Sequence, residues 1–284
     1  MLYVGPALAE GRLSFEASLA SFDVASARFP AERIPLPAPT DPENEPADGS
    51  EYLADIDVTR QFCFPSPSVG FSERCDLIKY FSSTYEAHVK AAFPQKKLRI
   101  IIEKDLFFAI AANYKYHFVI SIGKNFIFSK EYTTKEVSAL LCHEIGHVLG
   151  ERQTNIDPFY TTIRRPLALA VEGEADYFAA ERCMPIILKE YGPIQPPHGP
   201  AIIDARCALK YKDEKQRNLC VITVNTFYNI LLKSSETVNP DMPSLDVRNR
   251  AQGTNPVQNS GQCRFDTYFN GALGLPRPAC WYAE

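Results

Sequence analysis

Two histidines and a glutamate stand close together in the middle of the chain, in the order His143-Glu144-Ile145-Gly146-His147. Residues four apart on an α-helix lie one turn apart on the same face, so both imidazoles can grip one metal ion. Catalytic zinc sites use three protein ligands and leave a fourth position for water. Glu144 can then act as the general base that takes a proton from the attacking water. The spacing therefore predicts a hydrolytic zinc site.

A second acidic motif, Glu172-Gly173-Glu174-Ala175-Asp176, follows further along the chain. A glutamate commonly completes a pair of histidine ligands, so we expect Glu172 to be the third ligand. Asp176 lies one helical turn later and is expected to accept a hydrogen bond from the far ring nitrogen of a ligating histidine. Glu174 is the alternative ligand. A plain acidic helix start, favoured by the helix dipole, is the competing explanation of these carboxylates.

The two histidines must be held by a helix, and the sequence predicts one. Thr133 and Glu136 have the spacing of a capping box, and Gly150 is a natural C′ residue at the other end. Apolar residues recur between them at helical spacing: Val137, Leu140, Leu141 and Val148. The pattern predicts an amphipathic helix that begins at Thr133.

Other helices are expected around this one. The helix of the acidic motif is predicted to begin near Pro166 and to stop before Pro185, because proline suits a first turn and ends a helix. Apolar periodicity predicts two further helices, over residues 72–93 and 213–232. The tail after Val238 is rich in Pro, Asn and Gly and is predicted to be irregular.

Runs of β-branched and aromatic residues predict a small sheet. They cover residues 98–102, 117–122 and 125–128, and Gly123 interrupts them. With the predicted helices, these strands indicate an α+β fold.

The two motifs together resemble the gluzincin pattern of the CAAX-prenyl-protease and HtpX-like peptidases, over roughly residues 97–184. The resemblance implies a zincin-like domain with an HExxH helix followed by an ExxxD helix. It also implies one Zn²⁺ per chain, held by His143, His147 and Glu172, with Glu144 as base and Asp176 in support. The family further implies an edge strand that aligns the substrate backbone, and the run 118–128 resembles its strand pair.

A weaker resemblance lies near the C-terminus. The family often carries a threonine-histidine-proline segment followed by an arginine. Here Thr254-Asn255-Pro256 precedes Arg264, so asparagine replaces the histidine and the gap to the arginine is longer. The resemblance implies that Asn255 or Arg264 stabilises the oxyanion. A turn and a surface arginine are the alternative.

The cysteines indicate the compartment. The eight cysteines form no CxxC pair, and their even number favours disulfides in an oxidising compartment. Plausible local pairs are Cys63–Cys75, Cys207–Cys220 and Cys263–Cys280. Cys142 lies inside the predicted zinc helix and is expected to be a buried free thiol, which leaves Cys183 without an assigned partner. A cytosolic protein with reduced thiols is the alternative.

The N-terminus fits an exported protein, periplasmic or secreted. Ala7-Leu8-Ala9 has the small-x-small pattern of a signal cleavage site, although an ordinary chain start explains it equally well. The formal charge of −4 gives no basic patch for nucleic acid, and no apolar run of about 18 residues predicts a membrane span.

Three regions are expected. They are a Pro-rich arm over 1–50, a catalytic domain over 51–237 and a Cys-containing segment over 238–284 packed on that domain. The expected function is a zinc endopeptidase acting on a protein or peptide substrate. One alternative is a zinc amidase that cleaves cell-wall amides. Another is a chaperone-like zinc protein whose site is closed, an idea that the asparagine at position 255 favours.

Overall fold

The computed structural model describes residues 69–103, 106, 108–150, 169–191, 199–234, 238, 253–254, 260–278, 280 and 282–283 of the 284-residue chain. All of them belong to one structural unit, Glu45–Glu284.

A three-stranded sheet forms one side of this unit. Its strands are β1 (Lys97–Glu103), β2 (Ala109–Asn113) and β3 (His117–Gly123), in the order β1-β3-β2. β1 runs parallel to β3 and β2 runs antiparallel to it, so the sheet is mixed. The central strand β3 is buried from Phe118 to Gly123, as its continuous apolar run predicts for a strand covered on both faces.

The predicted third strand is wrong. Residues 125–128 belong to a short helix, α3 (Lys124–Phe128). Phe126 and Ile127 are both buried, although a strand would send such neighbours to opposite faces. A helical turn lets both side chains face the core. The second strand that pairs with β3, besides β1, is β2, which the strand patterns above do not predict.

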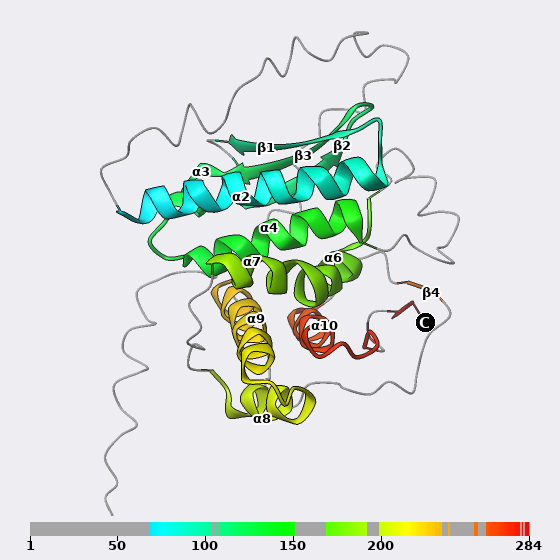
Figure 1. Ribbon diagram of the computed structural model, residues 1–284. Coiled ribbons are helices and arrows are strands. Elements are labelled where there is room, and N and C mark those ends of the chain that lie inside the picture. The colour runs from blue at the N-terminus through cyan, green and yellow to red at the C-terminus, as the bar shows by residue number, and fades with distance from the viewer. Residues whose placement is uncertain are drawn as a thin grey trace, which may run out of the picture. The chain divides into compact units, whose positions relative to one another are not determined.

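Helices make up most of the remaining described structure, and Figure 1 shows how they stack. They are α2 (Val69–Ala92), α4 (Thr134–Leu149), α6 (Glu172–Phe178), the π-helical turn η2 (Ala179–Cys183), α7 (Met184–Tyr191), α8 (Ala201–Lys210), α9 (Glu214–Lys233) and α10 (Gly261–Leu273). Helix α4 lies between the sheet with α2 on one side and the helices α6, α7, α9 and α10 on the other. The predicted helices over 72–93 and 213–232 are confirmed as α2 and α9.

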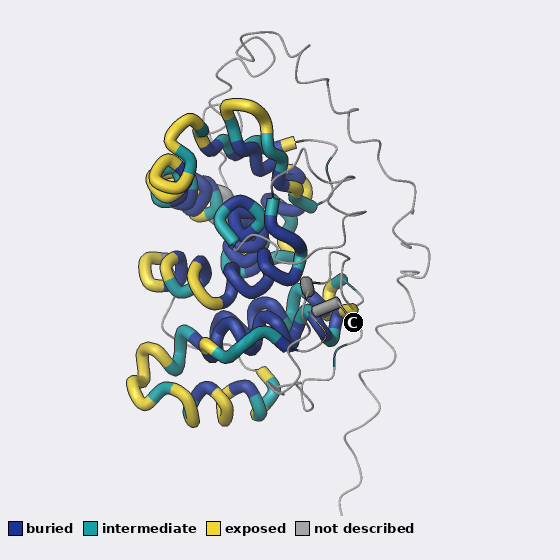
Figure 2. The backbone as a smooth tube through the Cα atoms, turned by 90° about the vertical axis from the view of Figure 1, so that its right-hand side faces the viewer, coloured by how far each residue is buried: buried dark blue, intermediate teal, exposed yellow. Residues whose placement is uncertain are grey.

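Burial follows this arrangement. In Figure 2 the buried residues run through the middle of the stack, and the exposed residues concentrate on its outer surfaces. Helix α4 is buried along most of its length because it packs on both sides, with Val137, Leu141 and Ile145 fully shielded from solvent. Side chains that project from α4 toward either neighbour are therefore held rigidly by close packing.

Helix α4 begins and ends at the residues that the sequence predicts. The capping box is confirmed, since Thr133 Oγ1 accepts from the Glu136 amide and a Glu136 carboxylate oxygen accepts from the Thr133 amide. Gly150 ends the helix with an ordinary φ of −62°, so it is no left-handed cap. Glycine fits there because a Cβ would lie 2.4 Å from the Gly146 carbonyl oxygen.

The helix of the acidic motif differs from its predicted bounds. Residues 169–171 are not helical, and α6 begins at Glu172 itself. The helical path then continues through η2 and past Pro185 into α7. The wide π turn changes the hydrogen-bond register, and Pro185 falls in the first turn of α7, where a missing N–H is tolerated.

The C-terminal tail is not irregular throughout. Helix α10 occupies Gly261–Leu273, with Ser260 as its N-cap and Gly274 as a left-handed C-cap. Phe265 and Phe269 are fully buried, and Tyr268 stacks on Phe227 of α9 at 3.7 Å between ring centroids. These aromatic contacts hold α10 in place despite the surrounding Pro, Asn and Gly residues.

The disulfides correct one prediction and confirm two. Cys142 is not a free thiol but is bonded to Cys183, since packing of α4 on η2 brings the two Cα atoms to 5.4 Å. The bonds Cys207–Cys220 and Cys263–Cys280 are confirmed. The predicted bond Cys63–Cys75 involves Cys63, which lies outside the described residues.

The described part of the chain is therefore α+β, mostly helical with a small mixed sheet. Among its helices, none combines the length and the apolar character that a membrane crossing requires.

Candidate metal centre

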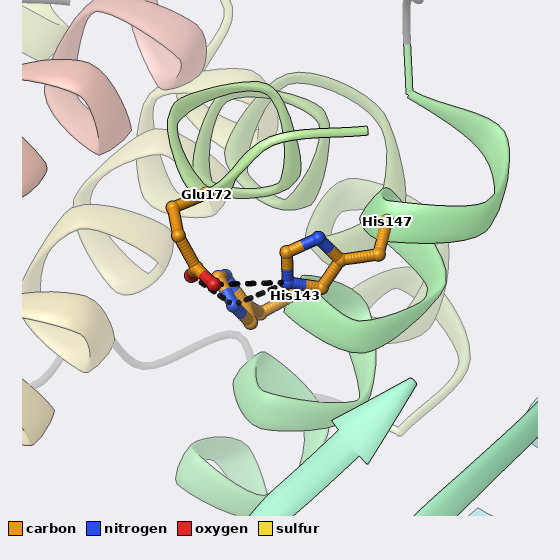
Figure 3. Close-up of side chains that lie close together, drawn as sticks. All are labelled: His143, His147 and Glu172. Carbon is orange, nitrogen blue, oxygen red and sulfur yellow. Dashed lines mark hydrogen bonds and ion pairs between the residues drawn. The ribbon is translucent and has the colours of Figure 1, made fainter. Parts of the chain in front are cut away.

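Three side chains from two helices converge on one point. His143 and His147 project from α4, and Glu172 projects toward them from the first position of α6 (Figure 3). The two imidazole Nε2 atoms are 3.2 Å apart. One carboxylate oxygen of Glu172 lies 3.1 Å from Nε2 of His143, and the other lies 3.7 Å from Nε2 of His147. All three side chains thus present a ligand atom to the same small space.

These separations fit a metal ion. Ligand bonds of about 2.0–2.1 Å arranged tetrahedrally place neighbouring donor atoms about 3.3 Å apart. The observed separations of 3.1–3.7 Å are close to that value, with each histidine facing a different oxygen of Glu172. Two imidazoles and one carboxylate, as a donor set, suit a divalent transition metal. The group could therefore hold a metal ion.

The Nδ1 atom of each imidazole, on the side away from the other ligand atoms, lies next to an acceptor oxygen. His143 Nδ1 lies 2.7 Å from Asp176 Oδ1. His147 Nδ1 lies 2.7 Å from the backbone carbonyl oxygen of Ala170. An acceptor behind each ring favours the tautomer that carries its proton on Nδ1 and leaves Nε2 with a lone pair. Both histidines are thus prepared to bind a cation through Nε2.

A glycine lets the two ligand-bearing helices meet. A Cβ on Gly146 would lie 2.6 Å from the carbonyl oxygen of Ala175 and 2.7 Å from its Cα. The backbone of α4 between the two histidines therefore touches the backbone of α6 between Glu172 and Asp176. This contact lets α6 present carboxylates from two successive turns to imidazoles from two successive turns of α4.

Asp176 is itself held by an arginine. Arg264 of α10 donates from Nε to Asp176 Oδ2 and from one terminal nitrogen to Asp176 Oδ1, both at 2.8 Å. The same terminal nitrogen donates to the hydroxyl of Tyr268 at 3.0 Å. Burial raises the pKa of Asp176, but the charges of Arg264 and His143 outweigh it and hold that pKa below its usual value. Asp176 is therefore ionised although its side chain is only 1% exposed.

Glu174, the alternative ligand, points away from the histidines. Arg277 donates to its carboxylate at 2.9 Å, and the Arg277 guanidinium lies 4.3 Å from the centre of the Tyr177 ring. Residues two apart on a helix point in nearly opposite directions, which explains why Glu172 and Glu174 have different partners.

The charges around the site favour a cation. With the imidazoles neutral and the carboxylates ionised, as metal binding requires, formal charges sum to −2 over the four carboxylates of Glu144, Glu172, Glu174 and Asp176 and the two guanidiniums of Arg264 and Arg277. A divalent cation would neutralise this group of charges.

The same preference for positive charge shows in His143 and Glu172. Burial lowers the pKa of His143, but Asp176 and Glu172 outweigh it and raise that pKa to about 10. Burial also acts on Glu172, but contacts with His143 dominate and hold the Glu172 pKa far below its usual value. Positive charge is thus stabilised where the three ligand atoms meet.

Glu144 lies next to the ligand group without joining it. Its side chain is buried, and burial raises its pKa, opposed by the smaller effects of His143 and His147. A carboxyl group can accept a proton and return it, and a raised pKa makes it a stronger base for that exchange. Glu172 is the most exposed of the three clustered side chains, with 30% of its side-chain surface accessible. The ligand group is therefore reachable from solvent on that side.

The two sequence motifs predict most of this group of residues. The structure brings His143, His147, Glu172 and Asp176 together, whereas Asn255 lies outside the described residues. Arg264 contacts Asp176, and its proposed action on an oxyanion stays a prediction.

The Ala170 carbonyl and the Tyr268 hydroxyl are parts of the site that the sequence did not reveal. No sequence motif marks a backbone acceptor. Tyr268 follows Arg264 by one helical turn, but this spacing has meaning only once the segment is known to be helical.

Comparison of the chain with protein-family models, with curated proteins and with solved structures gave no match. The site must therefore be interpreted from its own geometry.

Proposed function

We propose that the protein is an exported zinc-dependent endopeptidase of the gluzincin type, with a zincin-like catalytic domain. The observation that carries the proposal is the combination of a three-ligand group with a buried carboxyl group, Glu144, beside it. A purely structural zinc site usually has four protein ligands and needs no such neighbour. Three disulfides among the described cysteines agree with an oxidising compartment.

His143, His147 and Glu172 would hold the zinc ion, and the acceptors behind the two imidazoles would keep both Nε2 atoms directed at it. When bound, zinc lowers the pKa of a coordinated water toward neutrality and polarises the substrate carbonyl. Glu144 accepts the proton of the attacking water on its carboxylate and then donates it to the leaving amine nitrogen. Arg264 and Asn255 remain candidates for stabilising the oxyanion, although two nitrogens of Arg264 already bond to Asp176.

A peptide substrate is favoured by the position of β2. This strand is one of the two edges of the described three-stranded sheet, and it packs against α4, the helix of the two histidines. An extended peptide that paired with an edge strand would have its carbonyl groups held in a fixed register. The family resemblance pointed to such a strand, and β2 replaces the run 118–128 as the candidate for this role.

The decisive experiment is metal analysis of the purified protein and of a Glu144→Gln variant. Both should contain about one zinc per chain, because Glu144 is not a ligand, and only the parent should hydrolyse casein. Purified cell wall, tested in parallel, separates a peptidase from an amidase. Absence of zinc from the parent, or full activity in the Glu144→Gln variant, would overturn the proposal.

A further inference from the structure

Both guanidiniums that reach α6 come from one short covalent loop. The Cys263–Cys280 bond closes a segment in which Arg264 directly follows the first cysteine and Arg277 precedes the second. Arg264 bonds to Asp176, and Arg277 bonds to Glu174. Their side chains are similarly shielded, with 16% and 18% of their surfaces exposed. The two residues thus form a natural pair for comparison.

Only one of these arginines is connected to a metal ligand. Arg264 holds both oxygens of Asp176 through two parallel hydrogen bonds, and Asp176 Oδ1 faces Nδ1 of His143. Two-point bonding fixes the plane of a carboxylate, which a single contact does not do. Arg277 bonds to Glu174, which points away from the histidines.

Arg264 is in turn held by α10. Its terminal nitrogen donates to Tyr268, whose ring stacks on Phe227 of α9. Gly271 lets α10 approach η2 and α6 closely, since a Cβ there would lie 2.9 Å from the Tyr177 carbonyl oxygen. The position of the guanidinium is therefore set by helix packing and not by its own flexible side chain.

We propose that Arg264 is a positioning residue of the metal site, which acts through Asp176 to aim the imidazole of His143 at the metal. This inference rests on the proposed metal site and goes beyond it. It assigns Arg264 a role in metal retention, which is separate from its candidate role at the oxyanion. It also gives the segment closed by the Cys263–Cys280 bond a role in metal binding.

A rival explanation makes the opposite prediction. If Arg264 mattered only through its positive charge, its removal would strengthen the binding of a cation, because like charges repel. Removing Arg277 would then have a similar effect. If Arg264 positions Asp176, its removal weakens binding, and Arg277 serves as the matched control. The sign of the change in affinity therefore separates the two explanations.

The test measures zinc affinity by chelator competition for the parent, Arg264→Met, Arg264→Lys, Arg277→Met and Asp176→Asn. Residues that support metal ligands typically contribute about 10–100-fold to metal affinity. We expect losses in this range for Asp176→Asn and Arg264→Met, a partial recovery for Arg264→Lys, and a change below about threefold for Arg277→Met. The visible absorption of the Co²⁺-substituted proteins should shift in Arg264→Met and Asp176→Asn but not in Arg277→Met.

Unfolding of the metal-free proteins in urea controls for damage to the fold. If Arg264→Met does not fold, Arg264→Lys carries the test, because an ammonium keeps the charge but lacks the two-point geometry. Zinc binding by Arg264→Lys and Arg264→Met as tight as in the parent, or tighter, overturns the inference and leaves the proposed peptidase intact. If the parent binds zinc but hydrolyses neither casein nor cell wall, and the Arg264 variants bind zinc more weakly than the parent, the inference holds while the proposed function fails.

Discussion

At the scale of single residues, the contacts of three nearby carboxylates distinguish their roles. Glu172, Glu174 and Asp176 occupy every second position of one helix segment, yet their partners differ. Glu172 faces the two histidines, and Glu174 faces Arg277. Asp176 lies between His143 and Arg264. The proposed ligation, the charge pairing and the proposed orientation of a ligand are thus divided among chemically similar groups. This division can be tested by changing one carboxylate at a time.

We expect Glu172→Gln to weaken zinc binding by more than about 100-fold, beyond the range typical of supporting residues. Glu174→Gln should leave zinc affinity nearly unchanged. It should instead lower the free energy of unfolding by about 1–3 kcal/mol, because it weakens a buried charged hydrogen bond with Arg277. Chelator competition and urea unfolding of both variants measure the two quantities. Equal loss of zinc from the two variants would contradict the assignment of Glu172 as the ligand.

At the scale of elements, the site depends on how closely α4 and the α6–η2 segment approach. Gly146 permits backbone contact with Ala175, and the Cys142–Cys183 bond joins the same two segments one residue before His143. Both contacts fix the spacing between the histidines and the carboxylates. The bond Cys207–Cys220 joins α8 to α9, neither of which carries a candidate ligand, so it offers a comparison.

Replacing both Cys142 and Cys183 by alanine should lower the free energy of unfolding by about 2–4 kcal/mol and also weaken zinc binding. The same change at Cys207 and Cys220 should cost similar stability without affecting zinc affinity. Urea unfolding in the presence of a chelator gives the stability, and chelator competition gives the affinity. If both double variants lost zinc affinity equally, the Cys142–Cys183 bond would have no special role at the site.

At the scale of the whole molecule, the site joins distant parts of the chain. The ligands come from α4 and α6, an acceptor comes from Ala170, and the charge behind Asp176 comes from α10. A metal ion bound here would hold these segments together and would be lost when the chain unfolds. Metal binding must then stabilise the folded state by linkage.

Chelation of zinc should therefore lower the melting temperature of the parent. At free zinc about 1,000-fold above Kd, the stabilisation is about 4 kcal/mol, which calorimetry resolves readily. The variant with alanine at His143 and His147 should melt at the same temperature with and without chelator. If chelation left the melting temperature of the parent unchanged, His143 and His147 would not bind a metal in the folded protein.

Local patterns in the sequence predicted local structure well. The capping box at Thr133, the helical spacing of His143 and His147, and the bounds of β1, β3 and α9 depend on residues a few positions apart. Failures came where packing overrides local preference. Phe126 and Ile127 form a helical turn because both are buried, and the tail folds into α10 because its aromatic residues pack on neighbouring helices.

The sequence by itself determined the ligand types and their spacing, because both follow from the period of a helix. Only the tertiary structure decided that Glu172 and not Glu174 meets the histidines, that Cys142 pairs with Cys183, and that Arg264 holds Asp176. These contacts join residues far apart in the chain. Whether such residues meet depends on how closely their helices pack, and no periodicity along the sequence specifies that distance.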